Sequence, residues 1–122
     1  MPGENILVVD DELLVGEALK RVLMREKYNV ESVLSGAAAL ELARQKKYDL
    51  AIIDKNMPGM NGIHTCAEMR KLCPDLAVIL ITGENEIPAD EFAAAGGGTI
   101  LFKPFLQGEV EDSVHKALKR AP

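Results

Sequence analysis

The sequence predicts an α/β domain in which a parallel β-sheet is covered by helices on both faces. Short apolar runs alternate five times with longer segments whose apolar residues recur at helical spacing. The runs over residues 50–53 and 77–81 contain no polar residue, which is typical of strands buried on both faces of a parallel sheet. Because the 122 residues include no repeat and no linker-like stretch, we expect residues 1–122 to form a single domain.

Most of the expected strands end where the composition changes abruptly. The first apolar run stops at acidic residues, the third at Asp54, the fourth at Thr82 and the fifth at Lys103. Proline follows the third and fifth runs within a few residues and forces the chain to turn. The expected strands cover residues 6–9, 29–34, 50–54, 77–82 and 99–102.

The expected helices begin and end at recognisable signals. Ser35 is suited to cap the second helix, Pro74 stops the third, and Pro88 opens the fourth, which ends at glycines 96–98. The first and last helices each carry one apolar stripe, and in the last helix this stripe begins with Leu106. The helices are expected over residues 12–26, 37–46, 62–72, 88–95 and 106–118.

The order of the strands in the sheet follows from the handedness of their connections. Right-handed crossovers restrict a five-stranded parallel sheet to few topologies. The flavodoxin-like order 2-1-3-4-5, a doubly wound (βα)5 sandwich, is the natural candidate. It puts the first and third strands side by side, where the carboxyl ends of the strands form a rim at which ligands bind.

The composition excludes several classes of function. The net charge is −5 and the only basic block is the short segment 116–120, which argues against direct binding of nucleic acid. No apolar run reaches membrane-spanning length, and the N-terminus lacks the pattern of a signal peptide. Cys66 and Cys73 fall on one expected helix about 10.5 Å apart by helical rise, too far for a disulfide. Reduced thiols and no export signal indicate a cytoplasmic protein.

Five polar residues stand at the carboxyl ends of four expected strands. In the 2-1-3-4-5 order, Asp10, Asp11, Asp54, Thr82 and Lys103 converge on one rim of the sheet. Crowded carboxylates repel one another unless a cation lies between them. Mg²⁺ suits carboxylate, carbonyl and water oxygens, whereas no histidine or cysteine stands at a strand end to favour Zn²⁺. The sequence therefore predicts a magnesium site.

This set of residues suits phosphoryl transfer, which relies on positioning and on electrostatic stabilisation of the phosphoryl oxygens. Asp54 would be the nucleophile and would form an acyl phosphate. Lys103 and Mg²⁺ would neutralise the phosphoryl oxygens, and Thr82 would donate a hydrogen bond to one of them.

Four motifs in order make the chain resemble the receiver domains of two-component response regulators. They are Val-Asp-Asp-Glu at 9–12, Asp-Lys-Asn-Met-Pro-Gly-Met-Asn-Gly at 54–62, Ile-Thr-Gly at 81–83 and Lys-Pro-Phe at 103–105. Each motif alone is weakly specific, whereas the ordered set covers nearly the whole chain and is strongly specific.

The resemblance implies a set of roles. A histidine kinase, a phosphotransfer protein or a small phosphodonor would phosphorylate Asp54, and the domain would then dephosphorylate itself. Mg²⁺ would be held by Asp11, Asp54 and the backbone carbonyl of Asn56, with Asp10 acting through water. The Lys103–Pro104 peptide bond would be cis. Asn56 and Glu84 would admit water for rapid hydrolysis.

Two departures from the family pattern affect the expected output. Ile100 stands where receivers usually carry a switch aromatic, and the interval between Thr82 and Lys103 is one residue shorter than usual. The fourth helix is therefore expected to be short, and the phosphorylation-dependent change to act on Pro88–Gly98. Downstream partners would be a protein or an output domain, and a homodimer would use the surface of the fourth helix, fifth strand and fifth helix.

Other functions remain open at this point. A pseudo-receiver would bind partners without being phosphorylated, and Ile100 favours that alternative while the complete acidic set opposes it. A hydrolase-type phosphotransferase with an aspartyl nucleophile needs a second acid two residues further on, where this chain has Asn56. A flavin-binding protein of the same fold needs a phosphate-binding loop after the first strand, where Asp10, Asp11 and Glu12 would repel a phosphate.

Overall fold

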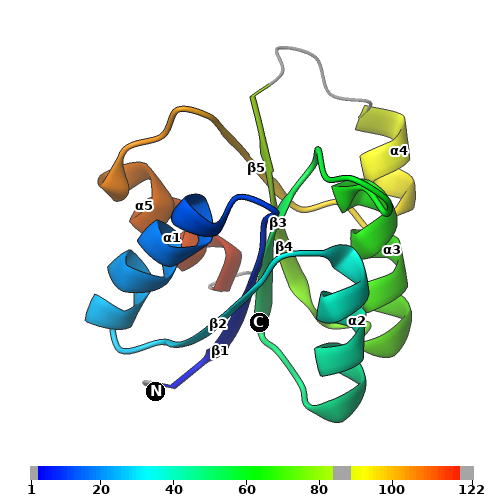
Figure 1. Ribbon diagram of the computed structural model, residues 1–122, viewed down its shortest axis with the longest axis horizontal. Coiled ribbons are helices and arrows are strands. Elements are labelled where there is room, and N and C mark those ends of the chain that lie inside the picture. The colour runs from blue at the N-terminus through cyan, green and yellow to red at the C-terminus, as the bar shows by residue number, and fades with distance from the viewer. Residues whose placement is uncertain (1–2, 84–88, 119–122) are drawn as a thin grey trace.

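The computed structural model describes residues 3–83 and 89–118. In this part of the chain, strands and helices alternate from β1 to α5 (Figure 1). The strands are β1 (Asn5–Val9), β2 (Asn29–Val33), β3 (Leu50–Asp54), β4 (Ala77–Thr82) and β5 (Thr99–Phe102). The helices are α1 (Leu13–Arg25), α2 (Gly36–Gln45), α3 (Gly62–Leu72), α4 (Ala89–Ala94) and α5 (Gln107–Leu118).

The five strands form one parallel sheet in the order β2-β1-β3-β4-β5, as predicted. Helices α1 and α5 cover one face, and α2, α3 and α4 cover the other (Figure 1). This is the doubly wound flavodoxin-like arrangement. It places the carboxyl ends of β1, β3 and β4 next to one another at a single rim.

The core consists of two apolar clusters, one on each face of the sheet. Alternate residues of a strand point to opposite faces, so Ile52 belongs to the cluster under α1 and α5, whereas Ile53 belongs to the cluster under α2, α3 and α4. Both side chains are almost completely buried, at 1% and 0% exposure. Because each central strand contributes to both clusters, its sequence is apolar throughout, which explains the runs that predicted it.

The ends of the elements confirm most of the expected signals. Ser35 caps α2, since its Oγ accepts a hydrogen bond from the backbone N–H of Ala38 at 3.1 Å. The Lys103–Pro104 bond is cis, as the family resemblance implied. Cys66 and Cys73 are both free. Helix α4 begins at Ala89, and Pro88 lies outside the described residues.

The prediction that Leu106 belongs to the apolar stripe of the last helix is wrong. Leu106 precedes α5 and its side chain is 74% exposed. Its backbone N–H donates to the carboxylate of Glu109 at 2.7 Å, and its carbonyl accepts from the N–H groups of Glu109 and Val110. Leu106 therefore occupies the capping position of the helix, where the side chain faces outward.

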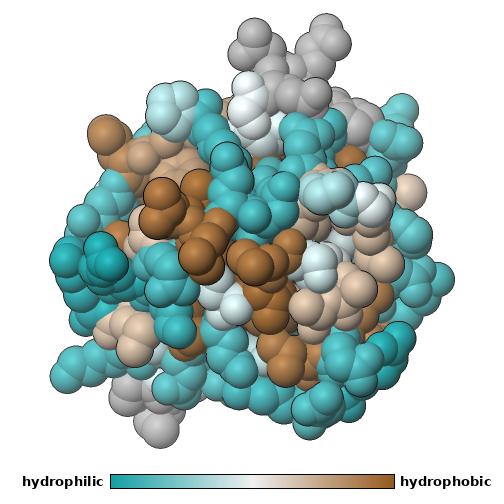
Figure 2. Space-filling model, viewed as in Figure 1, coloured by the Kyte–Doolittle hydropathy of each residue, from teal (hydrophilic) through white to brown (hydrophobic). Residues whose placement is uncertain are grey.

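Some apolar side chains stay at the surface. Figure 2 shows that they gather on this view over the start of α1 and the end of β2. Leu13, Leu14 and Leu34 lie there and are 57%, 82% and 50% exposed. None of the described helices combines the length and the apolar character needed to cross a membrane.

Candidate functional site

Four of the five residues predicted to converge, all except Asp11, meet at the carboxyl rim of the sheet. Asp10 directly follows β1, Asp54 and Thr82 are the last residues of β3 and β4, and Lys103 directly follows β5. Asp10, Asp54 and Thr82 are buried, at 1%, 4% and 0% exposure. Polar groups this deeply buried are costly unless they are paired, so their presence at one rim indicates a functional site.

The loop after β1 holds the Asp10 carboxylate rigidly. The backbone N–H of Asp10 donates to the carbonyl of Val33 at 3.1 Å, which extends the pairing of β1 with β2. Its Oδ1 accepts the backbone N–H of Glu12 at 2.9 Å. Its Oδ2 is buried and has no hydrogen-bond partner among the described residues. An unsatisfied buried carboxylate oxygen calls for a proton or a cation.

The Asp54 carboxylate is oriented by two donors. Its Oδ1 accepts the backbone N–H of Asn56 at 3.2 Å, and its Oδ2 lies 3.5 Å from the ammonium nitrogen of Lys103. Two backbone hydrogen bonds hold the turn after β3. The N–H of Lys55 donates to the carbonyl of Ile81, and the N–H of Gly62 donates to the carbonyl of Lys55. The Asp54 carboxylate is therefore held at the carboxyl rim of the sheet, beside the Lys103 ammonium.

Lys103 reaches the acidic residues from the other edge of the sheet. Its backbone N–H donates to the carbonyl of Thr82 at 2.8 Å, and its ammonium nitrogen lies 3.3 Å from Glu12 Oε1. Burial by itself would lower the pKa of Lys103, but the negative charges of Asp54 and Asp10 outweigh it and raise this pKa above its ordinary value. Lys103 is therefore a permanent cation at neutral pH.

The pKa of Asp10 is raised to about 6 in the metal-free protein. Burial is the largest cause, and the negative charge of Asp54 adds to it. The N–H of Glu12 and the charge of Lys103 oppose the shift without cancelling it. A bound cation would favour the ionised form of Asp10 instead.

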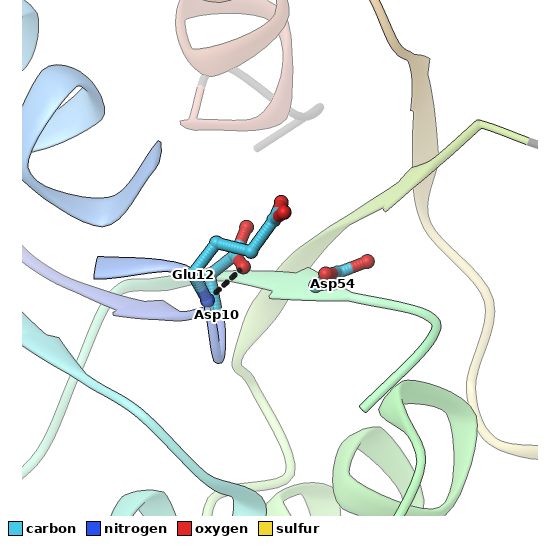
Figure 3. Close-up of side chains that lie close together, drawn as sticks. All are labelled: Asp10, Glu12 and Asp54. Carbon is cyan, nitrogen blue, oxygen red and sulfur yellow. Dashed lines mark hydrogen bonds between the residues drawn. The ribbon is translucent and has the colours of Figure 1, made fainter. Parts of the chain in front are cut away.

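Three carboxylates form a group that could hold a metal ion. Asp10, Glu12 and Asp54 each offer one oxygen, and these oxygens lie within 4.8 Å of one another (Figure 3). A set made only of carboxylate oxygens, one of them buried without a partner, fits Mg²⁺. The residues present are thus chemically suited to the ion that the sequence predicted.

The group differs from the predicted ligand set in one acidic residue. Asp11 is exposed and lies outside the group, whereas Glu12 lies inside it. Sequence reasoning assigned no role to Glu12, although the residue stands in the first motif and has the longer side chain. Asn56 is exposed and contacts Asp54 through its backbone N–H, and Glu84 lies outside the described residues.

Comparison with known proteins identifies the family. The family model for the response regulator receiver domain matches residues 6–115. The chain belongs to this family. The receiver is 34% identical over 124 residues to the response regulator RppA of Synechocystis, covering 97% of this chain and 52% of RppA. It is 32% identical over 119 residues to sporulation initiation phosphotransferase F of Bacillus subtilis, covering 97% of this chain and 96% of that protein.

Solved structures of other proteins share this fold. The chemotaxis protein CheY4 of Vibrio cholerae superposes with a TM-score of 0.89 at 27% identity, covering 94% of this chain and 98% of CheY4. NtrX of Brucella abortus superposes with a TM-score of 0.86 at 26% identity over 93% of this chain, which is only 26% of NtrX. The receiver thus spans about half of RppA and a quarter of NtrX, but nearly all of CheY4.

Family membership fixes the broad function. The receiver is a signalling domain of two-component response regulators and not a classical enzyme. Receiver domains act with histidine kinases or phosphodonors and with output domains, and they bind Mg²⁺ at an acidic pocket. In this chain, Asp10, Glu12 and Asp54 form a group of carboxylates that could hold such an ion.

Ile100 lies apart from this pocket, on the α4 side of the sheet. It is partly buried against the apolar cluster that contains Phe92 of α4 and Ala95. A β-branched side chain in such packing has few accessible rotamers. The position that usually carries the switch aromatic is therefore a packing position in this receiver.

Proposed function

We propose that this receiver accepts a phosphoryl group on Asp54 in a Mg²⁺-dependent reaction and then releases it by self-catalysed hydrolysis. The observation that carries the proposal is the Asp54 carboxylate, which is buried at a strand end with Lys103 Nζ 3.5 Å away and with further carboxylates beside it. A carboxylate held in this way can act as a nucleophile toward phosphorus.

The transfer is an in-line displacement at phosphorus. A carboxylate oxygen of Asp54 forms the new P–O bond while the bond from phosphorus to the leaving atom breaks. The leaving group, a histidine nitrogen of a kinase or the acetate of acetyl phosphate, takes the bonding electron pair. Lys103 neutralises charge on the phosphoryl oxygens, and the Thr82 hydroxyl donates a hydrogen bond to one of them.

The ion would be held by Asp10, Asp11, Asp54 and the backbone carbonyl of Asn56, with Glu12 at the same mouth. Bound Mg²⁺ supplies positive charge that offsets the crowding of carboxylate and phosphoryl oxygens. The buried Asp10 Oδ2, which has no partner among residues 3–83 and 89–118, supports this assignment.

Hydrolysis of the acyl phosphate needs water at the mouth of the site. Asn56 is exposed next to Asp54, so its side chain leaves the mouth open and can orient a water molecule. We therefore infer a short-lived phosphorylated state, with the domain catalysing only its own phosphorylation and dephosphorylation.

Where the phosphodonor is a protein such as a histidine kinase, it would cover the start of α1, and the reaction would take place in the cytoplasm. The segment from Asp10 to Glu12 leads directly into the apolar surface of Leu13 and Leu14, so a protein that reaches Asp54 must cover that surface. Leu14→Ser should slow transfer from a phosphorylated kinase and leave labelling by acetyl phosphate unchanged. Equal slowing with both donors would contradict this docking side. A homodimer through α4, β5 and α5 stays a prediction.

Labelling by acetyl phosphate tests the proposed function. Incubation with acetyl phosphate and Mg²⁺ should add one phosphoryl group to the intact mass of the protein. Asp54→Asn should abolish the gain, because an amide is not a nucleophile of this kind, and excess chelator should do the same. If the parent gains no phosphoryl group, the second candidate is favoured: a pseudo-receiver that only binds partners, to which the Ile100 packing position already points.

A further inference from the structure

Glu12 is the N-cap residue of α1, and its carbonyl accepts the first hydrogen bonds of the helix, but its side chain does not cap the helix. Its backbone is extended, with φ −94° and ψ 109°, and its side chain makes no capping hydrogen bond. The side chain extends instead from the end of β1 toward Asp54 (Figure 3). It ends 3.3 Å from the ammonium nitrogen of Lys103, a residue 91 positions further along the chain.

Lys103 is thus shared between two carboxylates. Its ammonium nitrogen lies 3.3 Å from Glu12 and 3.5 Å from Asp54. Both distances are longer than a strong charge-assisted hydrogen bond of about 2.8 Å, so neither acid holds the ammonium alone. The Glu12 side chain is 61% exposed and that of Lys103 is 28% exposed, so water competes with the contact. An ion pair this exposed opens at small cost.

A phosphoryl group on Asp54 would need the same ammonium. Lys103 offers three N–H donors, and a phosphoryl group brings three strong acceptor oxygens into the space beside Asp54. The carboxylate of Glu12 then competes with those oxygens for the donors. Charge repulsion also disfavours keeping Glu12 beside a phosphoryl dianion.

We propose that Glu12 is a positioning residue that holds Lys103 in the unphosphorylated receiver and must release it for phosphoryl transfer. The proposal rests on the proposed function of Asp54. Glu12 therefore slows phosphorylation through its contact with Lys103. Removing the Glu12 charge frees Lys103 for the phosphoryl group before the donor arrives.

The test is a double-mutant cycle on the rate of phosphorylation. The proteins are the parent, Glu12→Gln, Lys103→Ala and the double variant, each labelled by acetyl phosphate at saturating Mg²⁺ so that a change in metal affinity does not enter the rate. Glu17→Gln is the matched control, since it removes one exposed carboxylate from α1, the helix that Glu12 precedes. Glu12→Gln should label about two- to five-fold faster than the parent, and Glu17→Gln should match the parent.

The background of Lys103→Ala decides whether Glu12 acts through Lys103. There the acceleration by Glu12→Gln should vanish, because the ammonium that Glu12 holds is absent. Equal acceleration in both backgrounds, or none in the parent background, overturns the proposal. Added salt should shrink the acceleration, because it screens the Glu12–Lys103 pair.

A second measurement does not depend on phosphorylation. The nuclear magnetic resonance signal of the Lys103 ammonium should move in Glu12→Gln and stay in place in Glu17→Gln. An unmoved signal overturns the contact whether or not the parent is labelled. If the signal moves but acetyl phosphate does not phosphorylate the parent, the contact exists and the proposed function is wrong. Glu12 then has no phosphorylation to slow.

Discussion

Gly62 illustrates how a single residue shapes the acceptor site. A Cβ atom at this position would lie only 2.3 Å from the carbonyl oxygen of Asp54 and 2.7 Å from Cα of Lys55. Both contacts are with backbone, which cannot turn aside as a side chain can. Gly62, the last residue of the motif at 54–62, is therefore required because the start of α3 packs directly on the end of β3.

We expect Gly62→Ala to destabilise the receiver by about 1–3 kcal/mol and to slow phosphorylation of Asp54. The added methyl group forces the backbone of Asp54 and Lys55 to move. Urea denaturation and labelling by acetyl phosphate measure the two effects. Gly108→Ala is the control, since a Cβ at Gly108 in α5 meets nothing within 4 Å. Comparable stability of Gly62→Ala and the parent would show that the loop gives way without cost.

Asp10 gives the metal-free receiver a characteristic dependence on pH. An aspartate in the unfolded chain titrates near 3.8, whereas Asp10 in the folded protein titrates near 6. Between these two values the folded state binds the extra proton, so this residue's contribution to the free energy of unfolding falls as the pH rises. The contribution is complete below about pH 4 and lost above about pH 6.

In the presence of chelator, the parent should therefore lose stability relative to Asp10→Asn as the pH rises from about 4 to about 6. Urea denaturation at intervals across this window measures it. Mg²⁺ should restore the parent at the upper end, because the ion binds the ionised carboxylate. A difference that stays constant across the window would mean that Asp10 titrates alike in both states.

At the scale of elements, Arg70 of α3 fastens the end of α4 to the rest of the fold. Its Nε donates to the carbonyl of Leu76 at 2.8 Å, and its Nη2 donates to that of Gly97 at 3.0 Å. Its Nη1 lies 3.4 Å from the carbonyl oxygen of Ala95, which also accepts from Cys66 Sγ. One guanidinium thus satisfies carbonyls that the glycine-rich end of α4 leaves without helical partners.

Arg70→Lys should loosen this connection, because an ammonium on a shorter chain cannot span the three carbonyls. We expect a loss of about 1–3 kcal/mol in stability and faster amide hydrogen exchange over residues 89–98. Arg44→Lys is the control, since Arg44 is exposed and pairs only with Glu41 among the residues described. Unchanged exchange over 89–98 in Arg70→Lys would show that α4 is held by other contacts.

The elements themselves were largely predictable, and the exceptions have physical causes. The runs at β3 and β4 are apolar because both faces are buried, so sequence alone located them. Leu106 misled the prediction because helical periodicity continues one residue beyond the helix, into its capping position. Arg70 gave no signal, since the carbonyls that it binds are backbone groups whose position depends on tertiary structure.

At the scale of the whole molecule, strand order is what converts separate residues into one site. Asp10, Asp54, Thr82 and Lys103 were predictable because each ends an apolar run and parallel strands align their carboxyl ends. That the Glu12 side chain joins Asp10 and Asp54 was not predictable, because it depends on where the chain turns between β1 and α1. The pairing of Glu12 with Lys103 likewise appears only in the folded chain, where the segments that follow β1 and β5 come together.

The measurement that tests the account most directly is chemical mapping of the phosphorylated residue. Borohydride reduces an acyl phosphate to an alcohol, so it converts a phosphorylated aspartate to homoserine, which peptide mass analysis can locate. After treatment with acetyl phosphate and Mg²⁺, we predict homoserine at position 54 and at no other position, and none in excess chelator. Modification at another carboxylate, phosphate retained on His64 or His115, or an unmodified Asp54 would contradict the account.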